Sequence, residues 1–389
     1  MTPPKILIVD DEPFNIDYLE QELEDADCIT ISAANGQEAL NKVQDEAPDL
    51  VLLDIMMPIM DGFEVLVRLK ADPATRHIPV IVISALDNLS SVVRGIHLGA
   101  EDYLPKPFEP TLLHARITSS LEKKRLRDLE HQYLQSLERE LEIGRQIQLG
   151  FLPSALPHID GWELAAYFKA AREVSGDFYD AFLLPDGDLV FLVGDVCGKG
   201  VGAALFMTLF RSLIRAATTD YFYDRGDAGT ISPTGRLQHI ISFTNQYVAN
   251  THGEASMFAT VFIGLLHPQD GVLRYINGGN EPALVLGKDQ EITPLWPTGP
   301  IVGVIPEAQY AVQEITLPRG SLLLAFTDGI TDALNPAGEA FGRDRIHQLL
   351  RASPTLPSAL LSLLEAELHQ FIHTAHQFDD ITLLALRAV

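Results

Sequence analysis

The sequence predicts an α/β domain over residues 1–120 and an α+β domain over residues 156–389, joined by a helical connector over residues 121–155. Three observations lead to this prediction. Apolar runs alternate with helical patterns in the first segment, the connector has no proline before Pro153, and strands with a hairpin turn signal follow in the last segment. A chain of 389 residues is also too long for one ordinary hydrophobic core.

The composition limits the classes of protein to which this chain can belong. The formal net charge is -25, and acidic residues outnumber basic ones in both predicted domains, by 21 to 8 and by 26 to 14. Nucleic-acid binding needs a basic surface, so we expect no nucleic-acid partner. We find no apolar run near the roughly 18 residues of a membrane span and no signal peptide. Two cysteines, Cys28 and Cys197, cannot form a disulfide framework. Together these features predict a cytoplasmic protein.

Strands and helices alternate in residues 1–120. Continuous apolar runs such as Val80–Ile83 are typical of strands buried on both faces, so we expect a doubly wound parallel sheet covered by helices. The expected strands are Lys5–Val9, Ile29–Ala33, Leu50–Leu53, Val80–Ile83 and Asp102–Leu104, with helices such as Phe14–Leu23 and Gly36–Glu46 between them.

Polar residues follow these strands where open α/β sheets bind ligands. Asp10 and Asp11 follow the first strand, Asp54 the third, Ser84 the fourth and Lys106 the fifth. Acids at strand ends are common on their own, but this ordered set of carboxylates, hydroxyl and ammonium predicts a Mg²⁺ site beside an acyl-phosphate acceptor.

The first domain resembles the response-regulator receiver family. The matching residues are Val9-Asp-Asp-Glu12, Leu53-Asp-Ile-Met-Met-Pro58, Ile83-Ser-Ala85 and Pro105-Lys-Pro107. The resemblance implies a flavodoxin-like fold, a cognate histidine kinase, and Asp54 as the phosphorylated residue. It also implies that Asp10, Asp11, Asp54 and the Met56 carbonyl hold Mg²⁺, that Ser84 and Lys106 contact the phosphoryl group, and that Tyr103 is the aromatic switch. The bond before Pro107 is expected to be cis.

The connector is predicted to be one helix from Leu121 to Leu152. Its apolar residues form two heptad registers, one residue out of step with each other. The first holds Leu126, Leu129 and Tyr133, and the second holds Leu134, Leu137, Leu141, Gly144 and Phe151. This break favours equally a coiled coil that joins two copies of the chain and a helix that packs on its own neighbours.

Two acids of the last segment are brought together by a hairpin. Asp177 begins a strand, Pro185–Asp188 is a turn signal, and Asp195 ends the returning strand beside the glycine-rich Gly198-Lys-Gly200 tract. Folding about this turn places the two acids within about one residue of opposite each other.

Further acids have a similar setting. Asp328 ends a strand at Ser321–Phe326, and Asp379 and Asp380 precede the final strand, Ile381–Leu386. A single Asp-Gly pair usually marks only a turn. The four acids Asp177, Asp195, Asp328 and Asp379 together predict a carboxylate site for two Mg²⁺ or Mn²⁺ ions, where a phosphate ester is hydrolysed.

The last segment resembles the PPM (protein phosphatase 2C-like) serine phosphatases of the type that regulates sigma factors. The matching stretches are Ser175-Gly-Asp-Phe-Tyr-Asp180, Gly194-Asp-Val-Cys-Gly-Lys-Gly200, Asn277-Gly-Gly-Asn-Glu-Pro282, Thr327-Asp-Gly-Ile-Thr-Asp332 and Asp379-Asp-Ile-Thr382. The resemblance implies a β-sandwich flanked by helices.

The resemblance also implies functional residues. Asp195 would bridge both ions, Asp177 and the Val196 carbonyl would serve one, Asp328 and Asp379 would serve the other, and Asp380 would be an extra or supporting ligand. The implied substrate is a phosphoserine or phosphothreonine protein, above all an anti-sigma-factor antagonist. Ser175, Cys197 and Asn280 depart from the usual family residues, and Asn280 leaves a role often filled by histidine in question.

Alternative interpretations concern function and several weaker features. A catalytically inactive adaptor that binds a sigma factor would lack metal acids, and a DNA-binding regulator would need a basic helix-turn-helix. Thr218–Leu237 is predicted to be a loop, and Arg211 and Arg215 to be structural. His369, His373 and His376 are expected to share a helix face without binding a metal.

Overall fold

The computed structural model describes residues 3–24, 26–85, 89–223, 232–352 and 356–389, without the side chains of 219–223. It divides into two compact units, Met1–Glu138 and Arg139–Val389.

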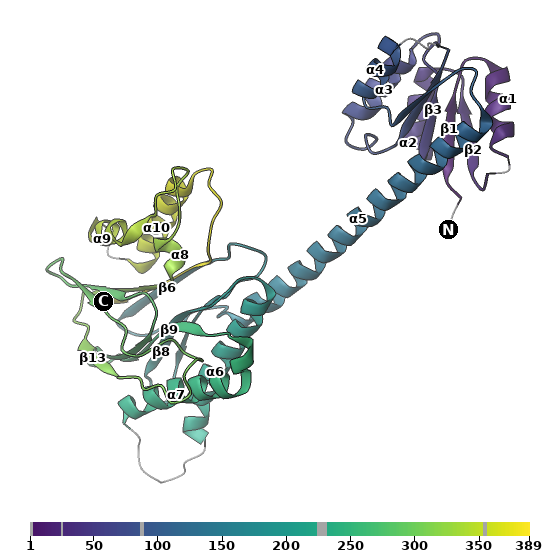
Figure 1. Cartoon of the computed structure of the whole chain (residues 1–389). Coiled ribbons are helices and arrows are strands. Elements are labelled where there is room, and N and C mark those ends of the chain that lie inside the picture. Colours follow the sequence, from purple (N-terminus) through teal and green to yellow (C-terminus); the bar gives the residue numbers. More distant parts are fainter. Residues whose placement is uncertain (1–2, 25, 86–88, 224–231, 353–355) are drawn as a thin grey trace. The chain divides into compact units, whose positions relative to one another are not determined.

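The first unit contains a five-stranded parallel sheet with the strand order β2-β1-β3-β4-β5 (Figure 1). Its strands are β1 (Lys5–Val9), β2 (Ile29–Ala33), β3 (Leu50–Leu53), β4 (Val80–Ser84) and β5 (Asp102–Pro105). The helices between them are α1 (Pro13–Glu22), α2 (Gly36–Glu46), α3 (Gly62–Ala71) and α4 (Leu89–His97). The predicted doubly wound parallel fold is therefore confirmed.

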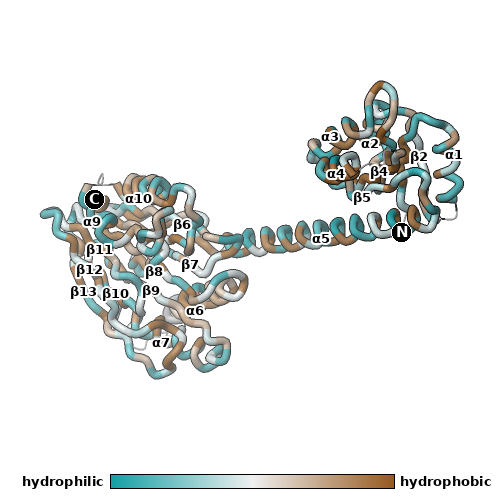
Figure 2. Tube along the Cα trace, turned by 45° about the horizontal axis from the view of Figure 1, so that its top comes forward, coloured by the Kyte–Doolittle hydropathy of each residue, from teal (hydrophilic) through white to brown (hydrophobic). Residues whose placement is uncertain are grey.

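Both faces of this sheet are buried, as the continuous apolar runs predict. Along β1, Leu7 and Val9 pack into one core while Ile6 and Ile8 pack into the other. The alternation follows from the two-residue period of a strand. Brown hydrophobic segments accordingly mark strands such as β4 in Figure 2.

The connector belongs to one long helix, α5 (Pro110–Phe151). It begins at Pro110 rather than at Leu121, because its first turns complete the hydrophobic core of the first unit. Leu113 is fully buried there and Ile117 nearly so.

The second unit is a sandwich of two antiparallel sheets, ordered β13-β10-β9-β8-β7 and β12-β11-β14-β15-β6. The first sheet contains β7 (Asp177–Leu183), β8 (Leu189–Val196), β9 (Ala259–His267), β10 (Val272–Gly278) and β13 (Gln313–Thr316). The second contains β6 (Trp162–Lys169), β11 (Ala283–Leu286), β12 (Ile292–Leu295), β14 (Leu322–Phe326) and β15 (Ile381–Ala388). The expected β-sandwich is confirmed.

Helices cover the outer faces of the sandwich. Those on one side are α6 (Val201–Tyr223) and α7 (Pro233–His252), and those on the other are α8 (Asp328–Thr331), α9 (Gly342–Ala352) and α10 (Pro357–Ile372) (Figure 1). A short 3₁₀ turn, Gly253–Ala255, follows α7. Phe191 and Leu384 belong to the core between the sheets, whereas Phe210 and Leu364 belong to the cores beneath the helices.

Helix α6 differs from the expectation that no apolar run is long enough for a membrane. Its stretch Val201–Thr218 could cross a membrane by length and composition alone. In this fold Met207, Phe210 and Ile214 of that stretch are fully buried against the sheet. The pattern is therefore weak support for a membrane span, because the core helix of a globular domain has the same composition.

The predicted loop Thr218–Leu237 is wrong at both ends. Helix α6 continues to Tyr223, and α7 begins at Pro233 with Ser232 as its N-cap, whose side chain accepts from Gly235 N. Arg236 and Leu237 are buried, which the polar sequence pattern does not predict. Residues 224–231 lie outside the described residues.

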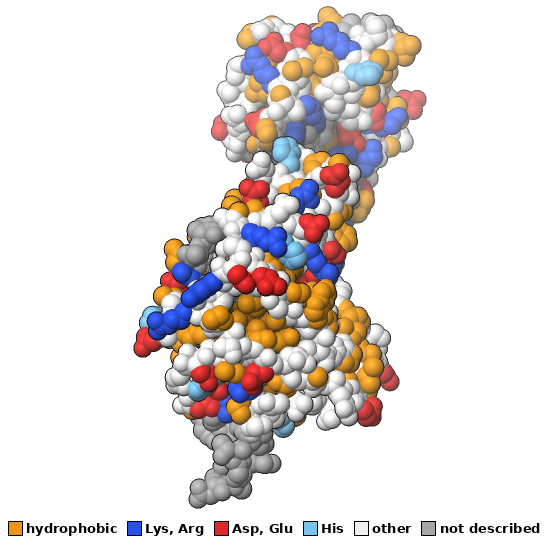
Figure 3. Space-filling view, turned by 90° about the vertical axis from the view of Figure 1, so that its left-hand side faces the viewer, with side chains coloured by type: hydrophobic (Ala, Val, Ile, Leu, Met, Phe, Trp, Pro, Cys, Tyr) orange, Lys and Arg blue, Asp and Glu red, His pale blue; other side chains and the backbone are white. Residues whose placement is uncertain are grey.

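The surface charge is mixed. On the face shown in Figure 3, lysine and arginine side chains are interspersed with aspartate and glutamate. This distribution accompanies a formal net charge of -25.

Candidate active site

The receiver site forms at the carboxyl edge of the parallel sheet. Val9 pairs with Leu53 across β1 and β3, so Asp10 and Asp54 emerge side by side. Lys106 joins them, with Nζ 2.7 Å from Asp10 Oδ2 and 2.8 Å from Asp54 Oδ1. Sequence order alone had predicted this convergence.

Burial and neighbouring charges have opposite effects on the pKa values of Asp54 and Lys106. Burial raises the pKa of Asp54, although the Lys106 ammonium offsets part of the effect. Burial lowers the pKa of Lys106, but its hydrogen bonds to Asp10 and Asp54 outweigh this and leave the pKa raised. The ammonium therefore stays charged beside the predicted phosphoacceptor.

The other receiver residues occupy distinct places. Ser84 is fully buried and Tyr103 is 8% exposed, while Asp11 and Met56 are exposed. Met56 N donates to Asp54 Oδ2 at 2.6 Å, which holds the loop against the carboxylate. The Lys106-Pro107 peptide bond is cis, as expected.

In the second unit, Asp177 and Asp195 are direct cross-strand partners on β7 and β8. This register follows from the turn at Gly187, which has a φ of 90° and lets Leu184 and Asp188 close the hairpin. Asp177 is 1% exposed, and its Oδ2 accepts a 2.7 Å hydrogen bond from Thr327 Oγ1.

Asp328 and Asp379 come from the second sheet. Asp328 opens α8 after β14, and Asp379 lies just before β15, the strand that pairs with β14. The two segments approach closely at Gly329, where an added Cβ would lie 1.8 Å from the backbone oxygen of Asp380. The glycine of the Asp-Gly pair is therefore needed for this contact between segments.

The acids of the two sheets act on one another. Burial, followed by the charges of Asp328 and Asp379, raises the pKa of Asp195 to about 7. Burial, followed by the charges of Asp195 and Asp380, raises the pKa of Asp177 well above its usual range. Asp328 is the most exposed of the four acids, and its pKa rises to about 6 through burial and the charges of Asp332 and Asp379.

The Asp380 side chain binds the backbone of a neighbouring segment. Its Oδ1 accepts from Ala171 N at 2.7 Å and its Oδ2 from Gly176 N at 2.8 Å. Both carboxylate oxygens thus hold the backbone just before Asp177. The role of Asp380 as an extra or supporting ligand stays a prediction.

Lys199 and Thr327 were missed as site residues. Lys199 Nζ lies 3.0 Å from Asp379 Oδ2 and above the Phe378 ring, with 3.9 Å to the ring centroid. Within the described part of the chain, it is the one cation in an ion pair with any of the four acids. In the sequence, the glycines on both sides of Lys199 indicate a tight loop. The contact between Thr327 and Asp177 depends on packing between segments far apart in the chain, so it has no local signal.

The donor set fits divalent metal ions. Four carboxylates with a single ammonium leave uncompensated negative charge, and oxygen ligands suit Mg²⁺ and Mn²⁺. The Val196 carbonyl lies beside the acid pair, because a Cβ on Gly176 would be 2.8 Å from Val196 O and 3.5 Å from Asp195 Oδ1. Among the described residues, no group of three or more acids, histidines or cysteines lies close enough together to hold a metal ion.

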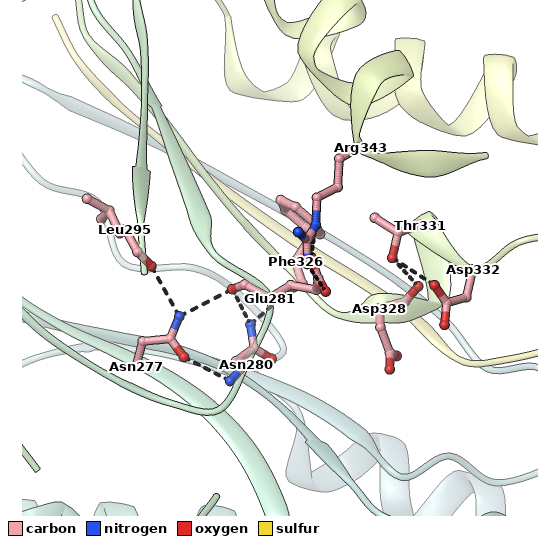
Figure 4. A network of polar contacts seen from close by, with 9 residues as sticks. All are labelled: Asn277, Asn280, Glu281, Leu295, Phe326, Asp328, Thr331, Asp332 and Arg343. Carbon is pink, nitrogen blue, oxygen red and sulfur yellow. Dashed lines mark hydrogen bonds and ion pairs between the residues drawn. The ribbon is translucent and has the colours of Figure 1, made fainter. Parts of the chain in front are cut away.

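Asn280 has a structural role in the loop beside Asp328 (Figure 4). Its Nδ2 donates to Phe326 O at 2.9 Å and to Glu281 O at 3.0 Å, and its Oδ1 accepts from Thr260 Oγ1. These bonds occupy the side chain and tie the loop to the end of β14. In the same view the Asp328 carboxylate points away from Arg343, which forms a double hydrogen bond with Glu281.

Arg211 and Arg215 are structural, as predicted. Both guanidinium groups bind Asp180, which is fully buried, at 2.6–2.9 Å. The histidine expectation was wrong in one respect, because α10 ends at Ile372 and His373 has a φ of 48°. His369 and His373 therefore do not share a continuous helix face.

Comparison with known proteins agrees with this architecture. Residues 6–118 match the response regulator receiver domain, and residues 185–389 match Stage II sporulation protein E (SpoIIE). The chain is 42% identical over 262 residues to Protein IcfG of Synechocystis sp., covering 64% of this chain and 41% of that protein. It is 38% identical over 157 residues to Response regulator PleD of Caulobacter vibrioides, covering 40% of this chain and 33% of that protein.

A solved structure has the same fold in the second unit. The SiaA-PP2C domain of Pseudomonas aeruginosa has a TM-score of 0.54 at 22% identity, covering 66% of this chain and 98% of that domain. This protein is thus a response-regulator receiver joined to a domain with the PP2C-like fold. Its matched residues show that the chain belongs to the Stage II sporulation protein E (SpoIIE) family. The chain spans less than half the length of the two curated relatives above.

Proposed function

We propose that this protein is a metal-dependent protein serine/threonine phosphatase controlled by its receiver, with domain limits 1–120, 121–155 and 156–389. The position of the acids carries the proposal. Asp177 lies opposite Asp195, and the charges of Asp328 and Asp379 raise the pKa of Asp195. Buried carboxylates with raised pKa values are typical of functional sites.

The acids have separate roles in this proposal. Asp195 would hold both of two Mn²⁺ or Mg²⁺ ions, Asp177 and the Val196 carbonyl would hold one of them, and Asp328 and Asp379 would hold the other. When bound, the ions supply the positive charge that stabilises a phosphoryl group under attack by water. Thr327 holds the Asp177 carboxylate in place, and Asp380 fixes the backbone before it.

The proposed substrate is a phosphoserine or phosphothreonine side chain on another protein, with a phosphorylated anti-sigma-factor antagonist as the specific candidate. The exposure of Asp328 supports a site that a protein surface reaches. The rival adaptor function would need no ionisable metal acids, so the presence of all four supports catalysis.

The receiver is proposed to be the control element, in the cytoplasm, with a histidine kinase as phosphodonor. Asp54 accepts the phosphoryl group, with Mg²⁺ held by Asp10, Asp11, Asp54 and the Met56 carbonyl. Lys106 supports this assignment because its ammonium contacts Asp10 and Asp54. Ser84 contacts the phosphoryl group, and Tyr103 is the aromatic switch.

A homodimer through the connector is the proposed assembly. Leu126, Leu129 and Tyr133 are 58%, 51% and 65% exposed on α5, at heptad spacing. The second register is mixed, because Leu134 and Leu137 are 51% and 37% exposed whereas Gly144 approaches Val174. The coiled-coil interpretation therefore concerns the part of α5 before Leu141, where residues of both registers are exposed.

Two substitutions test the catalytic proposal. Asp195→Asn and Asp328→Asn should each abolish Mn²⁺-dependent hydrolysis of a phosphoserine protein, because each removes a charged ligand. Asp160→Asn is the matched control, since its side chain is fully exposed. Full activity in both site variants would refute the proposal, and a wild-type protein that binds a partner without Mn²⁺-dependent turnover would establish the adaptor.

A further inference from the structure

We propose that Gln148, on the connector helix α5, is a positioning residue of the acid site. Its side-chain amide holds the backbone of Ser175 and thereby sets the place of Asp177. This inference rests on the proposed metal-dependent phosphatase function, and it adds a contact through which the connector acts on the metal site.

The contact between Gln148 and Ser175 is a double hydrogen bond. Gln148 Nε2 donates to Ser175 O at 2.6 Å, and Ser175 N donates to Gln148 Oε1 at 3.0 Å. Gln148 is 5% exposed and Ser175 is fully buried. A buried amide with both ends paired fixes the position and the orientation of the peptide group that it binds.

The Ser175 backbone leads directly to the acids. Asp177 N donates to Ser175 Oγ at 3.0 Å, and Gly176 N donates to Asp380 Oδ2 at 2.8 Å. Val196 N, at the end of the partner strand β8, donates to Gly176 O at 3.3 Å. The segment 175–177 is therefore held from α5, from the start of β15 and from the end of β8.

The final turns of α5 are packed so that Gln148 cannot easily be replaced in this role. Gly144, one turn before Gln148, faces Val174, and a Cβ there would lie 3.9 Å from Val174 Cγ1. Leu152, the first residue after α5, is 8% exposed in the same core as Val196. Residues four apart lie on the same helix face, so this face of α5 packs on the segment before β7.

A shift of the helix end would consequently reach the acids through Gln148. Because α5 begins at Pro110 within the first unit and continues without a break to Phe151, this contact lies on the same helix that leaves the receiver. Moving the Ser175 backbone would change the distance between Asp177 and Asp195, and with it the affinity for divalent ions.

The test is Gln148→Met in the full-length protein, with Mn²⁺ binding measured by titration calorimetry. Methionine keeps the length of the side chain but neither donates nor accepts these hydrogen bonds. We expect the dissociation constant for Mn²⁺ to rise by roughly five-fold or more, the effect of losing about 1 kcal/mol of positioning. Gln146→Met is the control, because Gln146 is exposed on the same helix and should stay within about two-fold of wild type.

Two further measurements keep the inference falsifiable. Gln148→Glu retains the acceptor for Ser175 N but places a carboxylate oxygen against Ser175 O, so its Mn²⁺ affinity should also fall below that of wild type. If Gln148→Met does not fold, Gln148→Glu alone must bind Mn²⁺ more weakly than wild type. Unchanged Mn²⁺ affinity in the folded variants, whatever their unfolding temperature, would overturn the positioning role.

Failure of the phosphatase proposal would look different. In that case the wild-type protein would not bind Mn²⁺ more tightly than Asp195→Asn. If the wild-type protein binds Mn²⁺ more tightly than Asp195→Asn, and the Gln148 variants bind it as tightly as wild type, only the positioning role of Gln148 is refuted.

Discussion

Manganese binding by the proposed phosphatase domain should weaken steeply below neutral pH, because the raised pKa values of its acids leave them partly protonated there. Burial and the charges of Asp328 and Asp379 raise the pKa of Asp195 to about 7, and burial with the charges of Asp332 and Asp379 raises that of Asp328 to about 6. A carboxylate must lose its proton to bind a metal ion, so protons compete with Mn²⁺ at both residues.

The size of the effect follows from these values. Between pH 8 and pH 6, the ionised fraction of Asp195 falls from about nine-tenths to about one-tenth, and that of Asp328 falls from nearly all to about half. If both must be ionised, the apparent Mn²⁺ association constant falls about twenty-fold. Asp328→Asn should reduce this change to less than half, since one titrating carboxyl is removed and the Asp328 charge no longer raises the pKa of Asp195.

Titration calorimetry at pH 6, 7 and 8 and constant ionic strength measures this dependence. An association constant that changes by less than about two-fold across that range would refute the electrostatic account of the site. The stability of the metal-free protein tests the direction of these pKa shifts independently. A raised carboxyl pKa stabilises the fold at low pH, and this stability is lost as pH rises from about 4 through about 7. Its unfolding temperature should therefore be higher at pH 5.5 than at pH 8, with a smaller difference in Asp195→Asn.

Two other substitutions test the receiver and the contact between segments. Beryllofluoride with Mg²⁺ should change kcat/KM for a phosphoserine protein in the wild type. In Asp54→Asn, kcat/KM should be the same with and without beryllofluoride. If kcat/KM is also unchanged by beryllofluoride in the wild type, receiver control is contradicted. Gly329→Ala should lower the free energy of unfolding by about 2 kcal/mol or more, because its Cβ would lie 1.8 Å from the Asp380 backbone oxygen. Gly202→Ala, with no atom within 4 Å of the added Cβ, is the control, and equal unfolding free energies in urea would contradict the close approach.

Much of the receiver and half of the acid site could be predicted from the sequence. The apolar runs Lys5–Val9 and Leu50–Leu53 predict buried parallel strands, and parallel strands bring Asp10 and Asp54 to one edge. The turn at Asp186-Gly187 predicts that Asp177 lies within about one residue of opposite Asp195, and the structure pairs the two directly.

Other features needed the tertiary structure. The start of α5 at Pro110 depends on the burial of Leu113 and Ile117 in the first unit, and α7 reaches into Thr218–Leu237 with Arg236 and Leu237 buried. Their local patterns were ambiguous, since a polar or charged residue such as Arg236 is buried only when its partners are in place.

By itself, the sequence determined the types of side chain at the strand ends and the local turns that aim them, because these depend on neighbours along the chain. Only the tertiary structure decided that Asp328 and Asp379 act on Asp195, that Asp380 braces the backbone, and that Gln148 reaches Ser175. The physical reason is distance along the chain. Contacts between segments far apart in sequence are set by how the two sheets and the helices pack, and no local pattern records that packing.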